Sequence, residues 1–97
     1  MAKVNWTAEA VRWLQDIRDY IAQDDPDAAL RVVRGIYDKV QLLRRFPEIG
    51  HAYTTRSDHN IRVLLHGHYR IAYVIKSNGS IDILGVFHGA MDIERYL

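Results

Sequence analysis

The spacing of apolar residues changes near residue 60, and this change constrains the fold of the chain more than any other feature. Before it, apolar residues recur every three or four positions, which is the spacing of one face of an α-helix. After it, they alternate with a period of two, which indicates β-strands. Helices followed by strands, in 97 residues without a linker or repeat, predict a single α+β domain over residues 1–97.

The first part of the chain predicts a short strand and a helix. Residues 3–6 form the candidate strand, with Val4 and Trp6 on one face. Thr7 is a suitable N-cap for a helix from about Ala8 to Gln23, because its hydroxyl can accept from the free amides of the first turn. The apolar stripe of this helix comprises Val11, Leu14, Ile17 and Ile21, with Trp13 and Tyr20 beside it.

A second helix is predicted directly after the first. Asp25 can cap it, and Pro26 fits the first helical position, where no amide donor is needed. Gly35 lies inside it at a cost of about 1 kcal/mol relative to alanine, which we interpret as a sign of close packing. The segment ends at Pro47 and Gly50. Its apolar stripe comprises Ala29, Val33, Ile36, Val40 and Leu43. Because the connection is so short, the two helices should form an antiparallel hairpin.

The second part of the chain predicts three strands joined by two tight turns. Gly67-His68 can form a two-residue turn with glycine first, and Asn78-Gly79 is a strong hairpin signal. The expected strands run from Ile61, from Tyr69 and from Ile81 to Phe87, and residues 90–97 fit a short helix and a loose end equally well. A three-strand antiparallel meander needs a further layer to be stable, so we expect the helical hairpin to pack on this sheet.

The register of the last hairpin is left open by two turn geometries. A two-residue Asn78-Gly79 turn places Tyr69 opposite His88. A three-residue loop, with Gly79 in the left-handed conformation, shifts the register by one and moves Arg70 onto the face of His88.

The sequence lacks the residues that several classes of function need. The chain contains no cysteine, no glycine-rich loop between a strand and a helix, and no nucleophile elbow. His66, His68 and His88 have no carboxylate at ligand spacing, so we predict no metal and no other cofactor. We also expect no small-molecule substrate.

Charge and hydropathy place further limits on the partners. The net charge is +1, which is less than the dense positive field usual in proteins that bind nucleic acid through its phosphates. No apolar run is long enough for a signal peptide or a membrane span. We therefore expect a cytoplasmic protein without membrane contact.

The predicted strands carry the candidate site residues. Arginine is costly to bury, so Arg62 and Arg70 should face solvent, pair with a carboxylate or line a functional surface. His88 ends the last strand, where an imidazole can exchange a proton near neutral pH. We expect Arg62, Tyr69 and Tyr73 to bind a partner. An open sheet edge and an apolar groove on the helices would suit a partner strand and a partner helix.

The order of these segments resembles the RelE/ParE superfamily of toxins over nearly the whole chain. The residues that carry the resemblance are Trp6 with Ala8–Ile21, Pro26-Ala28-Ala29, Leu43 with Phe46-Pro47 and Gly50, Arg62-Val63-Leu64, Tyr69–Tyr73 and Ile83–His88. The resemblance implies an N-terminal strand, a helical hairpin and an antiparallel sheet. It also implies the toxin of a type II toxin–antitoxin system, used in plasmid stabilisation and neutralised by a cognate antitoxin.

The superfamily contains two activities, and the resemblance favours one of them here. RelE-like members cut messenger RNA on the ribosome, and on that alternative Arg70 and His88 would be the catalytic residues. However, Gly89 stands where a catalytic tyrosine often follows, and the loop from Glu48 to Asn60 contains no lysine. The ParE-like branch, which inhibits DNA gyrase and cleaves no bond itself, is therefore the leading hypothesis. A third alternative is a non-toxic interaction module of the same fold.

Overall fold

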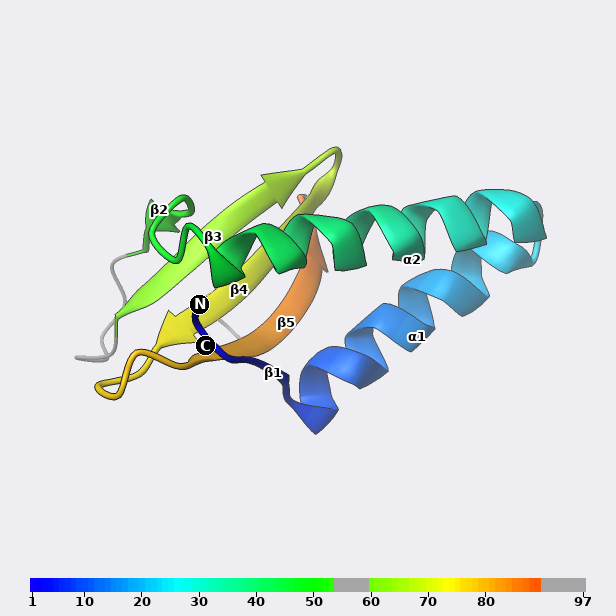
Figure 1. Cartoon of the computed structure of the whole chain (residues 1–97). Coiled ribbons are helices and arrows are strands. Elements are labelled where there is room, and N and C mark those ends of the chain that lie inside the picture. The colour runs from blue at the N-terminus through cyan, green and yellow to red at the C-terminus, as the bar shows by residue number, and fades with distance from the viewer. Residues whose placement is uncertain (54–59, 90–97) are drawn as a thin grey trace.

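The computed structural model describes residues 1–53 and 60–89 and shows a helical hairpin packed on a five-stranded sheet (Figure 1). The elements are β1 (Val4–Trp6), α1 (Ala8–Ala22), α2 (Pro26–Gln41), a short 3-10 helix η1 (Leu42–Arg44), β2 (His51–Ala52), β3 (Ile61–His66), β4 (Tyr69–Ile75) and β5 (Ile81–His88). The predicted α+β fold, with two helices followed by a three-strand meander, is confirmed. The two alternatives for the C-terminal segment lie outside the described residues.

Both helices begin at the predicted caps. The amide of Ala10 donates to Oγ1 of Thr7 at 3.1 Å, and the amide of Ala28 donates to Oδ1 of Asp25 at 3.1 Å. Pro26 occupies the start of α2, as its fixed φ and missing amide donor favour. The starts of both helices are therefore set by local chemistry that can be read from the sequence.

The N-terminal strand pairs with the last strand, so the sheet is mixed rather than wholly antiparallel. The strand order is β1-β5-β4-β3-β2, and β1 runs parallel to β5, with Asn5 opposite Asp82. Thr7 fixes this arrangement, because its Oγ1 donates to the carbonyl of Ile83 at 2.6 Å while it caps α1. The cap of the first helix is thus also its anchor on the sheet.

The β4–β5 hairpin combines both predicted geometries. Its turn is the longer one, with Ile75 opposite Ile81 and Gly79 at a φ of +86°. A bulge then shifts the register: Tyr73 pairs with Ile83 but Ala72 pairs with Gly85. This shift restores the pairing expected from a two-residue turn, so Tyr69 lies opposite His88 after all.

The core lies between the helices and the sheet, with a smaller cluster on the opposite face of the sheet. The main cluster of fully buried side chains includes Ile36, Val40, Leu43, Ile71, Tyr73, Ile81, Ile83 and Val86. On the other face, Phe87 packs with Val63 and Ala72, and its ring meets that of Trp13 edge-on with centroids 4.8 Å apart. The sheet is therefore apolar on both faces.

The far end of the helical hairpin projects beyond the sheet (Figure 1). Ala10 is the only fully buried residue of α1, and Tyr20 is 76% exposed. The predicted apolar stripe of α1 is consequently buried only in part, with Val11 exposed. Within the described residues, no helix is long and apolar enough to cross a membrane.

Candidate functional site

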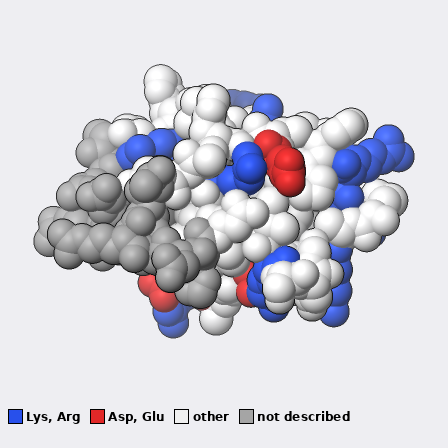
Figure 2. Space-filling model, turned by 90° about the vertical axis from the view of Figure 1, so that its left-hand side faces the viewer, with Lys and Arg blue, Asp and Glu red and all other residues white. Residues whose placement is uncertain are grey.

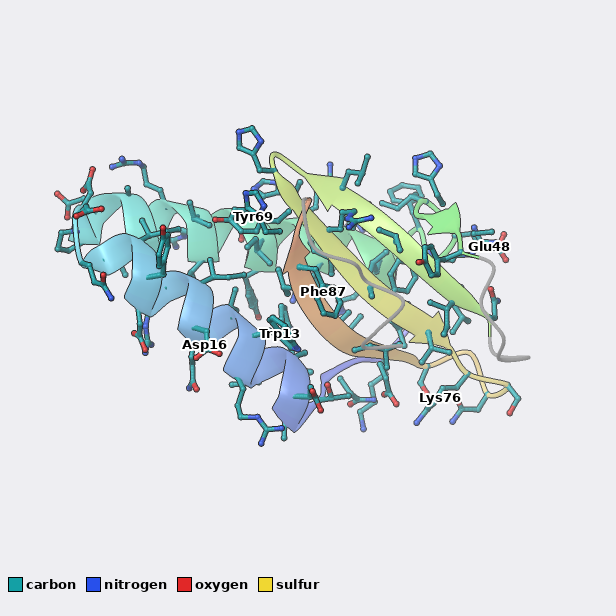
Figure 3. All side chains as sticks on the ribbon, turned by 180° about the vertical axis from the view of Figure 1, so that it is seen from behind. Trp13, Asp16, Glu48, Tyr69, Lys76 and Phe87 are labelled. Atoms are coloured by element: carbon teal, nitrogen blue, oxygen red, sulfur yellow. The ribbon has the colours of Figure 1, made fainter. Side chains whose placement is uncertain are left out.

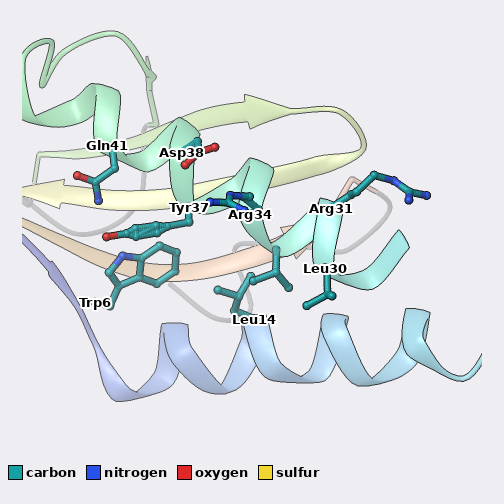
Figure 4. A pocket seen from close by; sticks show the side chains of 9 residues that line it. Trp6, Leu14, Leu30, Arg31, Arg34, Tyr37, Asp38 and Gln41 are labelled. Carbon is teal, nitrogen blue, oxygen red and sulfur yellow. The ribbon is translucent and has the colours of Figure 1, made fainter. Parts of the chain in front are cut away.

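A groove runs along the outer side of α2, between that helix, β1 and the first part of α1 (Figure 4). We call it the α2 groove; it is lined by Trp6, Leu14, Leu30, Arg31, Val33, Arg34, Tyr37, Asp38 and Gln41. Leu30 is 65% exposed and Tyr37 is 45% exposed. Large apolar side chains thus line a solvent-open surface of the helical layer.

The groove exists because α2 carries two apolar faces. One face packs on the sheet through Ile36 and Val40, which are fully buried. Leu30 and Tyr37, seven residues apart, lie on one side of the helix two turns apart, and Arg34 lies between them. This second row has no sheet or helix of the described chain to cover it.

The rim of the groove is basic. Within the described part of the chain, Arg31 and Arg34 form no ion pair or hydrogen bond. A second hollow shares Tyr37 and Gln41 with the groove and adds Lys3 and Arg44. Among the described residues, Asp38 is the one carboxylate that lines either hollow. Two arginines and one aspartate therefore line the apolar groove, and two further cations line the neighbouring, more polar hollow, although the whole chain carries a net charge of only +1.

Two of the predicted partner-binding residues, Arg62 and Tyr73, hold the segment 47–50 in place. Nη1 of Arg62 donates to the carbonyls of Glu48 and Gly50 at 3.1 and 2.9 Å. The hydroxyl of Tyr73 donates to the carbonyl of Pro47 at 2.7 Å and accepts from the amide of Gly50 at 3.0 Å. We call these contacts the 47–50 clamp. Tyr73 has no exposed surface, so it offers no direct contact to a partner in this conformation.

The clamp is closely packed as well as hydrogen-bonded. A Cβ atom added to Gly50 would lie 2.7 Å from Oη of Tyr73 and 3.0 Å from the carbonyl oxygen of Val63. Only glycine therefore fits against the Tyr73 ring at this position. Burial raises the pKa of the Tyr73 hydroxyl above its usual value, which keeps it protonated as a donor.

At the end of the molecule near β2 and the β4–β5 turn, the described residues show no concentration of charge. In Figure 2, positive and negative side chains are dispersed among uncharged ones on the described part of this face. The described part of this face therefore shows no continuous basic surface of the kind that phosphate binding favours.

Histidine and tyrosine side chains gather at the opposite end of the sheet, and Figure 3 shows Tyr69 at that end, far from Glu48. The rings of Tyr69 and His88 meet edge-on with centroids 5.9 Å apart, and the rings of His68 and His88 are nearly parallel at 6.3 Å. His66 packs against α2, where a Cβ on Gly35 would lie 2.7 Å from its Nε2. This contact confirms the close packing predicted at Gly35.

Arg70 and His88, the catalytic pair of the nuclease alternative, lie on opposite faces of the sheet. His88 is opposite Tyr69, whereas Arg70 is opposite Phe87 on the neighbouring position. Because successive side chains of a strand alternate, the two functional groups point away from each other. Nη2 of Arg70 donates to the carbonyl of Gly89 at 3.3 Å. Among the described residues, no group of three or more His, Asp or Glu side chains is placed to hold a metal ion.

The residues of the α2 groove were not among the predicted site residues. The sequence contained a signal for them: Leu30 and Tyr37 share a helical spacing that does not coincide with the core stripe of α2. A second apolar row with arginines between its members is unexpected on a helix that has only one buried face. Tyr69, by contrast, stays half-buried beside His88, and a partner-binding role for it remains a prediction.

Comparisons with known proteins agree with this architecture. Residues 4–93 match the family described as the ParE toxin of type II toxin-antitoxin systems, parDE. The chain is 38% identical over 86 residues to a protein of Sinorhizobium fredii named "Putative toxin Y4kP". The aligned residues make up 89% of this chain and 86% of that protein.

Two solved structures share the fold. A chain of the chromosomal ParDE system of P. aeruginosa matches with a TM-score of 0.74 and 24% identity, over 91% of this chain and 96% of that one. A chain of the toxin-antitoxin complex RelBE2 of Mycobacterium tuberculosis matches with a TM-score of 0.63 and 24% identity, over 90% and 96% of the two chains. At this level of identity, the likeness concerns the fold.

Proposed function

Because this chain belongs to the ParE toxin family of type II toxin–antitoxin systems, we propose that it arrests bacterial growth by binding and inhibiting DNA gyrase, and that a cognate antitoxin neutralises it. Both events would take place in the cytoplasm, where DNA and newly made antitoxin are present. On this proposal the toxin acts by occupying a surface of its target and breaks no covalent bond.

The separation of Arg70 from His88 is the observation that carries the choice of a binding toxin. Cleavage of RNA by this pair would need the guanidinium to stabilise charge on the same phosphate whose attacking or leaving oxygen exchanges a proton with the imidazole. The register of β4 and β5 turns the two side chains to opposite faces. The pair is therefore not preorganised for that chemistry.

The surface charge supports the same choice. A protein that docks on ribosomal RNA gains most of its affinity from phosphate contacts. Two arginines of this chain, Arg31 and Arg34, line the apolar groove on the helices instead, and the charged side chains on the described part of the clamp end of the sheet are dispersed. A basic rim around apolar side chains suits a protein partner better than a nucleic acid backbone.

The experiment that tests the proposal measures both activities of the purified chain. We expect it to inhibit the supercoiling of relaxed plasmid by bacterial DNA gyrase and to leave messenger RNA intact in a translating extract. In cells, induction should cause filamentation and DNA damage. Cleavage of messenger RNA at ribosomes without inhibition of gyrase would contradict the proposal, and growth unaffected by induction would favour a non-toxic interaction module.

The nuclease alternative has its own discriminating variants. If Arg70 and His88 cleave RNA after a rearrangement, Arg70→Ala and His88→Gln should each abolish toxicity while the protein stays folded. On the gyrase proposal, no chemical step depends on either side chain, so folded variants should remain able to arrest growth. Circular dichroism spectra would show that both variants retain the fold.

A further inference from the structure

We propose that the hollow beside the 47–50 clamp is the surface by which this toxin binds DNA gyrase, and that it takes an apolar segment of gyrase flanked by a lysine or arginine. We call it the clamp hollow; it is lined by Phe46, Pro47, Glu48, Ile49, Ile75 and Gly79. The inference rests on the proposed function, because it assumes that gyrase is the target. It goes further by naming the contact surface and the chemistry of the segment that binds there.

The first argument is that one wall of the hollow is rigid. Every residue from 46 to 50 has a main-chain group held by a hydrogen bond. The clamp supplies four of these bonds. In addition, the amide of Phe46 donates to the carbonyl of Leu42 at 2.9 Å, and the amide of Ile49 donates to the carbonyl of Phe46 at 3.2 Å. Connecting segments are usually the mobile parts of a fold, so one that is held this firmly is preorganised for contact.

The second argument is what this rigid segment displays. Phe46 and Ile49 expose 54% and 43% of their surfaces, although the main chain that carries them is fixed. Ile75 of β4 adds a half-buried apolar side chain to the lining, and the hollow has a volume of about 520 Å³. Exposed apolar side chains in a hollow mark an interaction site, because they gain free energy when a partner excludes water. On a fixed main chain they lose little freedom on binding.

The third argument is charge. Among the described residues, Glu48 is the one charged residue that lines the hollow, and within them its exposed carboxylate forms no ion pair or hydrogen bond. A carboxylate beside apolar side chains attracts a lysine or arginine of a partner and fixes the orientation of the bound segment. The same carboxylate repels the phosphates of a nucleic acid. The hollow therefore suits a protein segment that is apolar and basic.

Other protein occupants fit less well. A symmetric contact between two copies would place both Glu48 carboxylates in one small interface, where like charges repel. An acidic segment that suits the α2 groove would meet the wrong charge here, because Arg31 and Arg34 line that groove and the two hollows share no residue. A folded enzyme presents a fixed surface, and two fixed surfaces can match with little rearrangement. We therefore assign the clamp hollow to the target.

The test compares variants of the full chain in a gyrase supercoiling assay. Ile49→Ser removes an apolar side chain from the hollow and Glu48→Lys reverses its charge, while the main-chain bonds of the clamp are kept. The matched controls are Leu65→Ser and Asp16→Lys, at exposed positions outside the hollow. We expect Ile49→Ser to raise the toxin concentration for half-inhibition at least about tenfold, and the controls to change it by less than about twofold. Glu48→Lys should raise it about fivefold, and added salt should shrink this effect.

Photo-crosslinking gives an independent readout that does not depend on a loss of activity. A p-benzoylphenylalanine placed at Phe46 keeps an aromatic ring at the hollow and should crosslink the toxin to a gyrase subunit. The same group placed at Tyr20, which is 76% exposed on α1, should not. The crosslinked gyrase peptide should contain apolar residues and a lysine or arginine. Circular dichroism spectra and urea midpoints would show that all the variants retain the fold.

The remaining outcomes would overturn the assignment. Equal inhibition by the hollow variants and the controls, with an active wild type, would exclude the docking site but leave the proposed function intact. Normal inhibition of gyrase by Ile49→Ser, with loss of antitoxin binding, would assign the hollow to the antitoxin instead. A free chain that is dimeric and becomes monomeric in Ile49→Ser would assign it to a second copy. A wild-type chain that does not inhibit gyrase would contradict the proposed function, and this inference with it.

Discussion

Arg62 on β3 and Arg34 on α2 are the same type of residue in opposite situations. The guanidinium of Arg62 is directed inward and donates to two main-chain carbonyls of the segment 47–50. Arg34 lies on the rim of a groove and, within the described residues, has no partner. The comparison teaches that an arginine on a strand can be used to complete the fold, whereas one on an exposed helical face is available for another molecule.

Replacement of the two arginines by methionine should separate these roles most clearly. Arg62→Met keeps the aliphatic stem but removes a charged donor from two carbonyls, so the free energy of unfolding should fall by about 2 to 3 kcal/mol. Arg34→Met should change it by less than about 0.5 kcal/mol, because the side chain is exposed and unpaired. Urea denaturation measures both changes. Equal losses in the two variants would show that the clamp does not stabilise the fold.

A pair of tyrosines extends the comparison to hydroxyl groups. Tyr73→Phe should cost about 1 to 2 kcal/mol, because the part-buried carbonyl of Pro47 and the buried amide of Gly50 lose their partner. Tyr37→Phe, in the α2 groove, removes a hydroxyl from an exposed ring and should be nearly neutral. Thermal unfolding of the two variants beside the wild type would test this, and a neutral Tyr73→Phe would contradict the structural role of the hydroxyl.

The same hydroxyl predicts a pH dependence that is confined to alkaline conditions. Burial raises the pKa of Tyr73 in the folded chain above its usual value of 10.0. Below that value both states are protonated, so Tyr73 contributes no pH dependence there. As the pH rises further, the unfolded chain loses this proton first, and the stability is progressively lost up to the folded pKa. Urea midpoints at about pH 9 and about pH 11 should differ less in Tyr73→Phe than in the wild type.

The smallest expected effect concerns the inner face of α2. Gly35 costs helix stability, but an alanine there would place its Cβ 2.7 Å from Nε2 of His66. In a His66→Ala background, Gly35→Ala should therefore raise the free energy of unfolding by about 1 kcal/mol. With His66 present the gain should be smaller, because the imidazole must move. A double-mutant cycle measures the difference, and two equal gains would exclude the contact.

Much of the architecture was predictable because its causes are local. The caps at Thr7 and Asp25, the glycine in each hairpin turn and the two periods of apolar spacing depend on residues a few positions apart. The family resemblance was also carried by such segments, taken in order. The candidate site was harder to predict from the sequence. Arg62 and Tyr73 were predicted to bind a partner, and for the half-buried Arg62 this stays a prediction, but the sequence did not reveal that both side chains hold the segment 47–50 against β3 and β4.

The sequence by itself determined the two helices, four of the five strands, their order along the chain and the class of fold, since helix caps, turn residues and the apolar spacing within each segment suffice for these. Only the tertiary structure decided which side chains share a surface. A single unpaired residue in β5 turns His88 away from Arg70, and the packing of α2 on the sheet leaves Leu30 and Tyr37 uncovered. Both outcomes depend on the registration of segments that are distant in the chain, because a shift of one residue in a strand exchanges its two faces.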